Sequence, residues 1–189
     1  MRILKKTLKV ITWIVGIFVL LVIGLSVFAW SVSDIDPPKV ADTSALALKK
    51  QQVEGTLLTI DNNWIRKNKY GLYEMYAEGA PFELGVVQGK LSQQLIVEQE
   101  EAFTSEIKRM VPSEGYLKFL KYFVGLMNRN LPENIPEDYQ KEIYGISHAA
   151  ADSFNWIGNN YARILNYHAA HDIGHALQNM MLVGCTSFG

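Results

Sequence analysis

The chain of 189 residues has a single cysteine, no excess of basic residues and no low-complexity tract. One cysteine cannot form a disulfide within the chain, which excludes a disulfide-stabilised miniprotein. The 18 basic and 19 acidic residues give a net charge of −1. That balance argues against a nucleic-acid partner, because proteins of that class normally carry a basic excess. Since 49% of the residues are hydrophobic, a disordered chain is excluded as well.

Charge is also missing from one long stretch near the N-terminus. No charged side chain occurs between Lys9 and Asp34, so Val10 to Ser33 is an uncharged run. A helix needs about 20 mainly apolar residues to cross a bilayer. The run lies between basic residues (Arg2, Lys5, Lys6, Lys9) and acidic ones (Asp34, Asp36). By the positive-inside rule, we expect a single-pass anchor with the body exported to the periplasmic or extracellular face.

A cleaved signal peptide is the alternative interpretation of the same run. Ser31 and Ser33 form a small-x-small cleavage pattern before Asp34. The apolar stretch is longer than the usual signal core of about 7–15 residues, which favours an uncleaved anchor. Four basic residues precede Val10, so the remainder holds 14 basic and 19 acidic residues and carries −5.

The rest of the chain is predicted to be mostly helical. We expect a flank and anchor over 1–33, a tether over 34–54, a helical propeptide or small-subunit region over 55–184, and the start of a nucleophile subunit over 185–189. Short strands are expected at Thr56–Ile60 and Tyr70–Glu78. Helices are expected at about 81–110, 114–129, 137–151 and 159–180. Two strands alone make a poor sheet, so this pair should need further chain to pair with.

A glycine-rich segment, Gly79–Gly89, lies at the strand-to-helix junction. It contains neither Gly-x-Gly-x-x-Gly nor a Walker pattern, so a phosphate site is not indicated. Gly85 and Gly89 are four residues apart and share a helix face, which favours close helix packing.

An aromatic, amphipathic segment runs from Tyr116 to Met127 and includes Lys118 and Lys121. A helix that packs this face on the core is the favoured interpretation. Contact with a membrane surface, or a lid over a lipid-like substrate, is the alternative.

Three of the four histidines, His168, His171 and His175, share one face of the last helix. His171 to His175 resembles the His-Glu-x-x-His signature, with Asp172 in place of the catalytic Glu. A metallohydrolase is therefore an alternative function. We favour packing or site lining without a metal, because Asp is shorter than Glu and Gly174 weakens the helix.

Cys185 follows Gly184 and precedes Thr186. A lone cysteine is most often a small buried hydrophobic residue. However, Gly-Cys-Thr at the end of such a segment resembles the processing site of the penicillin acyltransferase-like family, whose members are cysteine N-terminal nucleophile (Ntn) hydrolases. Other segments resemble the family in the same order: Tyr73-Glu74-Met75-Tyr76, Glu78-Gly79-x-Pro81-x-Glu83-x-Gly85-x-x-x-Gly89, Ile135-Pro136-Glu137-Asp138-Tyr139-x-x-Glu142-Ile143-x-Gly145-Ile146-Ser147, Arg163-Ile164-Leu165-Asn166-Tyr167 and Asp172-x-x-His175.

The resemblance implies an α+β fold, the N-terminal portion of an αββα sandwich, mostly helical here and preceded by the single transmembrane helix. It implies that Cys185 is the nucleophile, that cleavage separates Gly184 from Cys185, and that no cofactor or metal is needed. Candidate lining residues are Arg163, Tyr167, Asp172, His175 and Thr186.

The substrate implied by the resemblance is a small acyl amide or acyl thioester, with hydrolysis and acyl transfer both open. The family's oxyanion-hole residues lie downstream of the nucleophile, so the activity should need the downstream catalytic region of the same precursor, and these 189 residues alone should be inactive. A non-catalytic, anchored helical binding domain is the remaining alternative.

Overall fold

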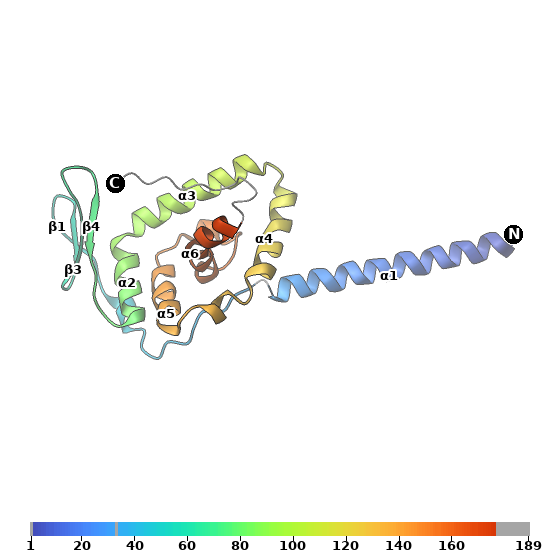
Figure 1. The fold of residues 1–189 in the computed structure, drawn as a ribbon, viewed down its shortest axis with the longest axis horizontal. Helices are drawn as coiled ribbons and strands as arrows, with labels where there is room; N and C mark the ends of the chain where they lie inside the picture. Colours follow the sequence, from blue (N-terminus) through green and yellow to red (C-terminus); the bar gives the residue numbers. More distant parts are fainter. Residues whose placement is uncertain (1, 33, 177–189) are drawn as a thin grey trace.

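The apolar N-terminal segment forms one long helix. A computed structural model describes residues 2–32 and 34–176, with side chains for 6–29, 31 and 34–169. Helix α1 (Arg2–Val32) extends away from the body (Figure 1). Its segment Lys6–Ala29 is long and apolar enough to cross a bilayer, and none of it is buried inside the protein. A signal sequence near the N-terminus can meet the same criteria of length and hydropathy, so cleavage and orientation stay predictions.

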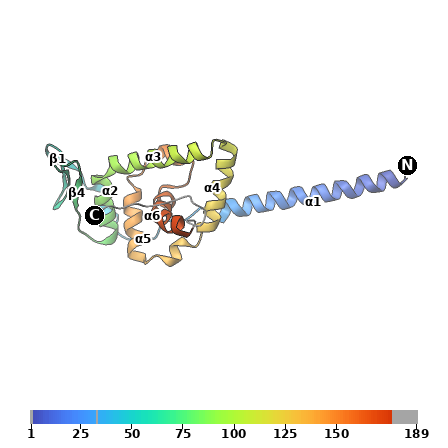
Figure 2. The same ribbon diagram turned by 45° about the horizontal axis from the view of Figure 1, so that its top comes forward.

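Four antiparallel strands form a sheet at the opposite end of the body from α1 (Figures 1 and 2). They pair in chain order: β1 (Gln51–Glu54), β2 (Leu57–Ile60), β3 (Asn63–Lys67) and β4 (Tyr73–Tyr76). β2 and β4 lie within the two predicted strands. The expectation of a single strand pair is wrong, because β1 and β3 supply neighbours for both. The tight β2–β3 connection places Asp61 at a φ of +50°, a conformation that Asp tolerates better than most residues.

The predicted helix over 81–110 is two helices. α2 (Pro81–Leu91) and α3 (Gln93–Met110) meet at Ser92. The Ser92 hydroxyl donates to the Gln88 carbonyl, with an O···O distance of 2.7 Å. Serine that bonds back four residues in this way tends to bend helices. The break lets α2 lie between the sheet and α5 while α3 runs across the top of the body (Figure 1).

Helix α2 packs on the sheet with one face and on α5 (Glu137–Ser147) with the other. Ile60, Ile65, Val87 and Leu91 form the core between sheet and helix. On the other side, the helices approach at glycines. A Cβ on Gly85 would overlap the Glu142 carbonyl oxygen, and one on Gly145 would overlap the backbone of α2. The predicted packing role of Gly85 is confirmed.

Helix α6 (Asn160–Ala176) packs on α5. The core between these helices contains Ile35, Ile143, Ile146, Tyr161, Ala162, Ile164 and Leu165. α5 ends at Ser147, before the predicted Ala151, because a short 3-10 turn (Asp152–Phe154) and a loop follow it. The predicted end of the last helix, near Met180, lies outside the described residues.

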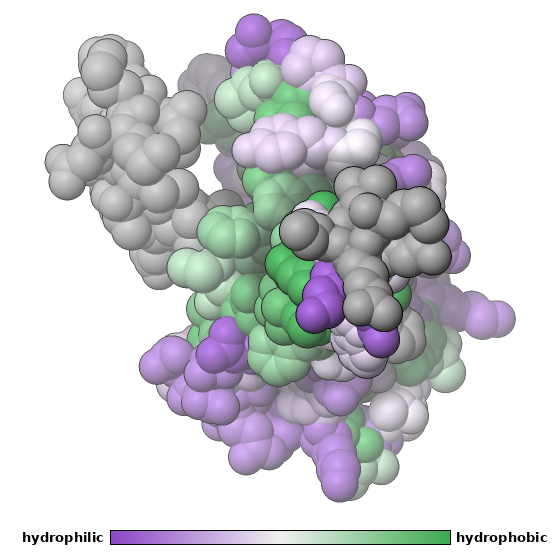
Figure 3. Space-filling model, turned by 90° about the vertical axis from the view of Figure 1, so that its right-hand side faces the viewer, coloured by the Kyte–Doolittle hydropathy of each residue, from purple (hydrophilic) through white to green (hydrophobic). Residues whose placement is uncertain are grey.

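Helix α4 (Glu114–Asn128) has nearly the predicted bounds, and the Ser113 hydroxyl caps it by accepting from the Tyr116 N–H. Its packing differs from the favoured interpretation. Only Leu117 and Gly125 are buried, whereas most of its aromatic side chains are exposed. Helix α4 lies on the side of the body from which α1 extends (Figure 1), and Figure 3 shows apolar surface on that side. The helix therefore contacts the body through a narrow face that includes Leu117 and Gly125, and its apolar face points outward.

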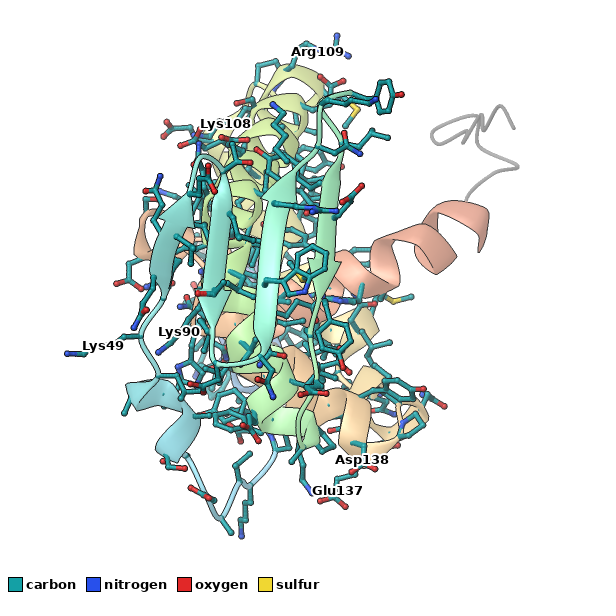
Figure 4. The ribbon with its side chains drawn as sticks, turned by 90° about the vertical axis from the view of Figure 1, so that its left-hand side faces the viewer. Lys49, Lys90, Lys108, Arg109, Glu137 and Asp138 are labelled. Atoms are coloured by element: carbon teal, nitrogen blue, oxygen red, sulfur yellow. The ribbon has the colours of Figure 1, made fainter. Side chains whose placement is uncertain are left out.

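The predicted tether over 34–54 makes many contacts with the body. Ile35 and Ala45 are buried, a short 3-10 turn (Ser44–Ala47) packs on α2, and β1 takes the last four residues. The Lys90 ammonium of α2 donates to the Leu46 carbonyl at 2.6 Å and also to the Leu48 carbonyl. Figure 4 shows Lys90 pointing toward this segment. Only a few positions of this segment carry apolar side chains. Its composition therefore predicted a tether and did not indicate these contacts.

His148 follows α5 and packs against two aromatic rings. Its ring centroid lies 4.9 Å from that of Tyr144 and 5.9 Å from that of Phe82. His148 keeps an exposed edge, but its partial burial against these rings, together with the positive charge of Lys90, lowers the pKa of His148. The unfolded chain would take up this proton near pH 6.5, whereas the folded chain takes it up only at lower pH.

We therefore expect the free energy of unfolding to decrease as the pH falls below about 6.5. His148→Phe should show a shallower decrease between pH 7 and pH 5, because it removes this group from the titration. Chemical unfolding midpoints across that range, measured for both proteins, test the expectation. Identical pH slopes would contradict it.

Candidate functional site

The predicted site residues fall into three groups. Gly184, Cys185 and Thr186 lie outside the described residues. Asp172 and His175 belong to α6 by their backbone, but their side chains are also outside the described part. Arg163 and Tyr167 are described in full, and the structure places them one turn apart on α6.

Arg163 is buried, with only 1% of its surface exposed. Its Nε donates to the Glu100 carboxylate at 2.9 Å. Its two terminal nitrogens donate to the Asn155 side chain at 2.6 Å, to the Gly158 carbonyl at 3.0 Å and to the Ala151 carbonyl at 2.8 Å. The guanidinium therefore fixes the loop that leads into α6, and it anchors that helix to α3.

Glu100 is the residue of this cluster that the sequence did not reveal. It is 1% exposed, and its second carboxylate oxygen accepts from the Ala151 N–H at 2.9 Å. It lies in the acidic run Glu98-Gln99-Glu100-Glu101, which is typical of a solvated face. The available signal was its spacing, since Glu100 follows Ile96 by four residues and precedes Phe103 by three, on the apolar side of α3.

Tyr167 lies next to this ion pair and lines a cavity of about 190 Å³. Burial, with a contribution from the negative charge of Glu100, raises the pKa of Tyr167 to about 12. Its buried hydroxyl has no hydrogen-bond partner among the described residues. Its ring meets the Phe103 ring edge-on, with centroids 5.1 Å apart. The phenol is thus a neutral donor at the wall of the cavity.

The other walls of the cavity are formed by Ile96, Gln99, Glu100, Ile146, Ile164 and His168. His168 Nδ1 lies 2.8 Å from the Ile164 carbonyl oxygen. Because a carbonyl can only accept, Nδ1 carries a hydrogen and donates it to this oxygen. The cavity therefore combines apolar walls with a hydroxyl, an imidazole and an amide. At about 190 Å³, the cavity is smaller than typical ligand pockets, which measure about 300–1,000 Å³.

The alternative of a metal site has no support within the described part of the chain, where no group of three potential ligand side chains comes together. The side chains of His171 and His175 are not among those described. The metallohydrolase alternative therefore stays untested.

Comparison of the chain with protein-family models, with curated proteins and with solved structures found no match. The family resemblance therefore depends on the residues quoted above and on their order along the chain. It enters below as a proposal.

Proposed function

We propose that this chain is the N-terminal part of a membrane-anchored, self-processing cysteine Ntn hydrolase, with Cys185 as nucleophile. The described fold is mixed, with helices and one antiparallel sheet. In the proposal, it is the first part of an αββα sandwich that the downstream region completes. The substrate class is a small acyl amide or acyl thioester.

One observation carries most of the support. Three described segments of the resemblance lie in helices, and they meet in two contacts, α2 on α5 and α5 on the first half of α6. The glycines of the resemblance make this possible, since Gly85 and Gly145 lie at the closest approach of α2 and α5. In the proposal, these two contacts form the packed core of the propeptide region.

The proposed maturation is an acyl shift from nitrogen to sulfur. The Cys185 thiol attacks the carbonyl carbon of Gly184, and the C–N bond breaks as the thioester forms. Water then hydrolyses the thioester, which leaves a carboxylate on Gly184 and a free amine and thiol on Cys185. Gly184 suits the step because a residue without Cβ tolerates a strained approach.

The mature enzyme would use both new groups of Cys185. An α-amino group has an unperturbed pKa near 7.7–8.0, so it can accept the thiol proton at neutral pH. The thiolate then attacks the substrate carbonyl and forms an acyl-enzyme, which water or an amine resolves. The described residues contribute by fixing α6, which is described as far as Ala176, eight residues before Gly184 in the sequence.

Intact-mass analysis of the precursor, expressed with the coding sequence downstream of Gly189, tests the proposal. We expect a break between Gly184 and Cys185, and the new N-terminal cysteine should condense with 2-cyanobenzothiazole, a reagent for 1,2-aminothiols. Cys185→Ala should stay intact, because no nucleophile remains at the junction.

Ser187→Ala is the matched control, since it alters a hydroxyl two residues away and should leave the cleavage unchanged. A wild-type precursor that stays intact would contradict the proposal. So would cleavage at the same bond in Cys185→Ala.

A further inference from the structure

Helix α4 carries an exposed apolar stripe that the proposed function does not use. The stripe consists of Tyr116, Phe119, Phe123 and Met127, which recur at intervals of three or four residues and so share one helix face. Their exposed fractions are 53%, 60%, 50% and 68%. The buried residues of the helix, Leu117 and Gly125, lie on the side that faces the body. Soluble proteins rarely leave so many large apolar side chains together in water.

The position of the stripe relative to α1 identifies what covers it. α4 contacts α1, and in Figures 1 and 2 it lies at the body end of α1 and runs across the direction of that helix. When α1 spans a bilayer, a helix that crosses its end lies in the plane of the lipid headgroups. Figure 3 looks from the α1 side, and apolar surface lies beside α1 in that view.

The charge of this helix also differs from that of the body. Between Glu114 and Arg129, the basic residues Lys118, Lys121 and Arg129 stand against one acidic residue, Glu114. The segment therefore carries +2, whereas the chain after the anchor carries −5. Interfacial helices combine an apolar face with basic residues in this way, because anionic headgroups attract the charge while the apolar face enters the acyl boundary.

We propose that α4 is a second membrane contact, which lies in the bilayer interface with its apolar stripe in the lipid while α1 spans the membrane. α1 holds the body at the bilayer, and α4 fixes which side of the body faces it. A protein partner on the same stripe is the competing outcome. The lipid is favoured because α1 brings α4 to the headgroup region, where that surface is already present.

Spin labelling of the full chain in nanodiscs tests the contact. Cys185→Ser provides the background, so that each protein carries one label. In nanodiscs of phosphatidylcholine and phosphatidylglycerol, we expect a label at Phe123→Cys to collide freely with oxygen and several-fold less with a water-soluble nickel chelate. This contrast reports a position within the lipid.

Two matched variants serve as controls. Lys118→Cys labels the same helix outside the stripe, and Val53→Cys labels an exposed position on β1, at the far end of the body. Both labels should be open to the nickel chelate. Because all three positions are on the surface or at its edge, circular dichroism should show the same helix content for each variant.

The outcomes are distinct. If the Phe123→Cys label is as open to the nickel chelate as the two controls, the stripe faces water and the proposal is wrong. If this label is shielded from both oxygen and the chelate, a protein surface covers the stripe, and the lipid contact is likewise overturned. None of these results depends on cleavage at Cys185.

Discussion

Glu100→Ala is expected to destabilise the body by about 3–5 kcal/mol, because it leaves the Arg163 guanidinium buried without its counter-charge. Both side chains are 1% exposed, so water cannot replace the lost partner. The Ala151 N–H loses its acceptor in the same variant. Domains of this size are stable by only about 5–15 kcal/mol, so the loss is a large fraction of the total. The change in unfolding free energy is measured by unfolding the full chain in detergent micelles with guanidinium chloride, followed by tryptophan fluorescence.

Two comparisons separate the buried charge from a general effect of substitution. Glu106→Ala breaks the exposed pair with Arg109 and should leave the unfolding midpoint unchanged. The double variant Glu100→Leu with Arg163→Met replaces both charges by apolar groups of similar size and should recover much of the loss. If Glu100→Ala unfolds at the wild-type midpoint, the ion pair does not anchor α3 to α6.

Gly85→Val is expected to destabilise the body by about 3 kcal/mol or more, at or above the upper range for overpacked cores. The added side chain would meet the backbone of Glu142, which cannot rotate away as a flexible side chain could. α2 and α5 would have to separate along their whole contact. The expected result is a lower unfolding midpoint, or a chain that no longer unfolds cooperatively.

Gly115→Ala is the matched control, because a Cβ there would meet nothing within 4 Å. Alanine is favoured over glycine in helices by up to about 1 kcal/mol, so this variant should be neutral or slightly more stable. A Gly85→Val protein as stable as Gly115→Ala would show that the helices can separate without cost.

The sequence predicted the elements with strong periodic or terminal signals. The uncharged run predicted α1, and the predicted helix over 114–129 matches α4. The spacing of Gly85 and Gly89 predicted close packing against another helix, and the structure identifies that helix as α5. Strand β3 was missed because Asn-Trp-Ile-Arg-Lys alternates poorly and follows a turn. It becomes a strand because β2 and β4 pair with it on both sides, a long-range effect that local patterns do not contain.

The site was predicted less completely than the fold. Arg163 was identified through the family resemblance, yet its partner Glu100 lies 63 residues away in the chain, within a run of charged and polar residues. Only the packing of α3 on α6 brings the two together. The exposed stripe of α4 shows the same limit, since an amphipathic pattern indicates an apolar face but not whether protein or lipid covers it. Cys185 stays a prediction from sequence alone.

When α1 is embedded in a membrane, as proposed, its short connection to the body limits how far the body can move from that membrane. The apolar segment ends at Ala29, and Ile35 is already part of the protein core. Asn159 fixes this point by donating to the side chain of Asp34 and, at 3.1 Å, to the Ile35 carbonyl. Because an extended chain spans at most about 3.6 Å per residue, the core begins within about 20 Å of the end of the apolar segment. Under the proposed anchoring, the body can tilt but cannot diffuse away from the surface, and it would meet molecules that move within the membrane plane more often than those in bulk solution.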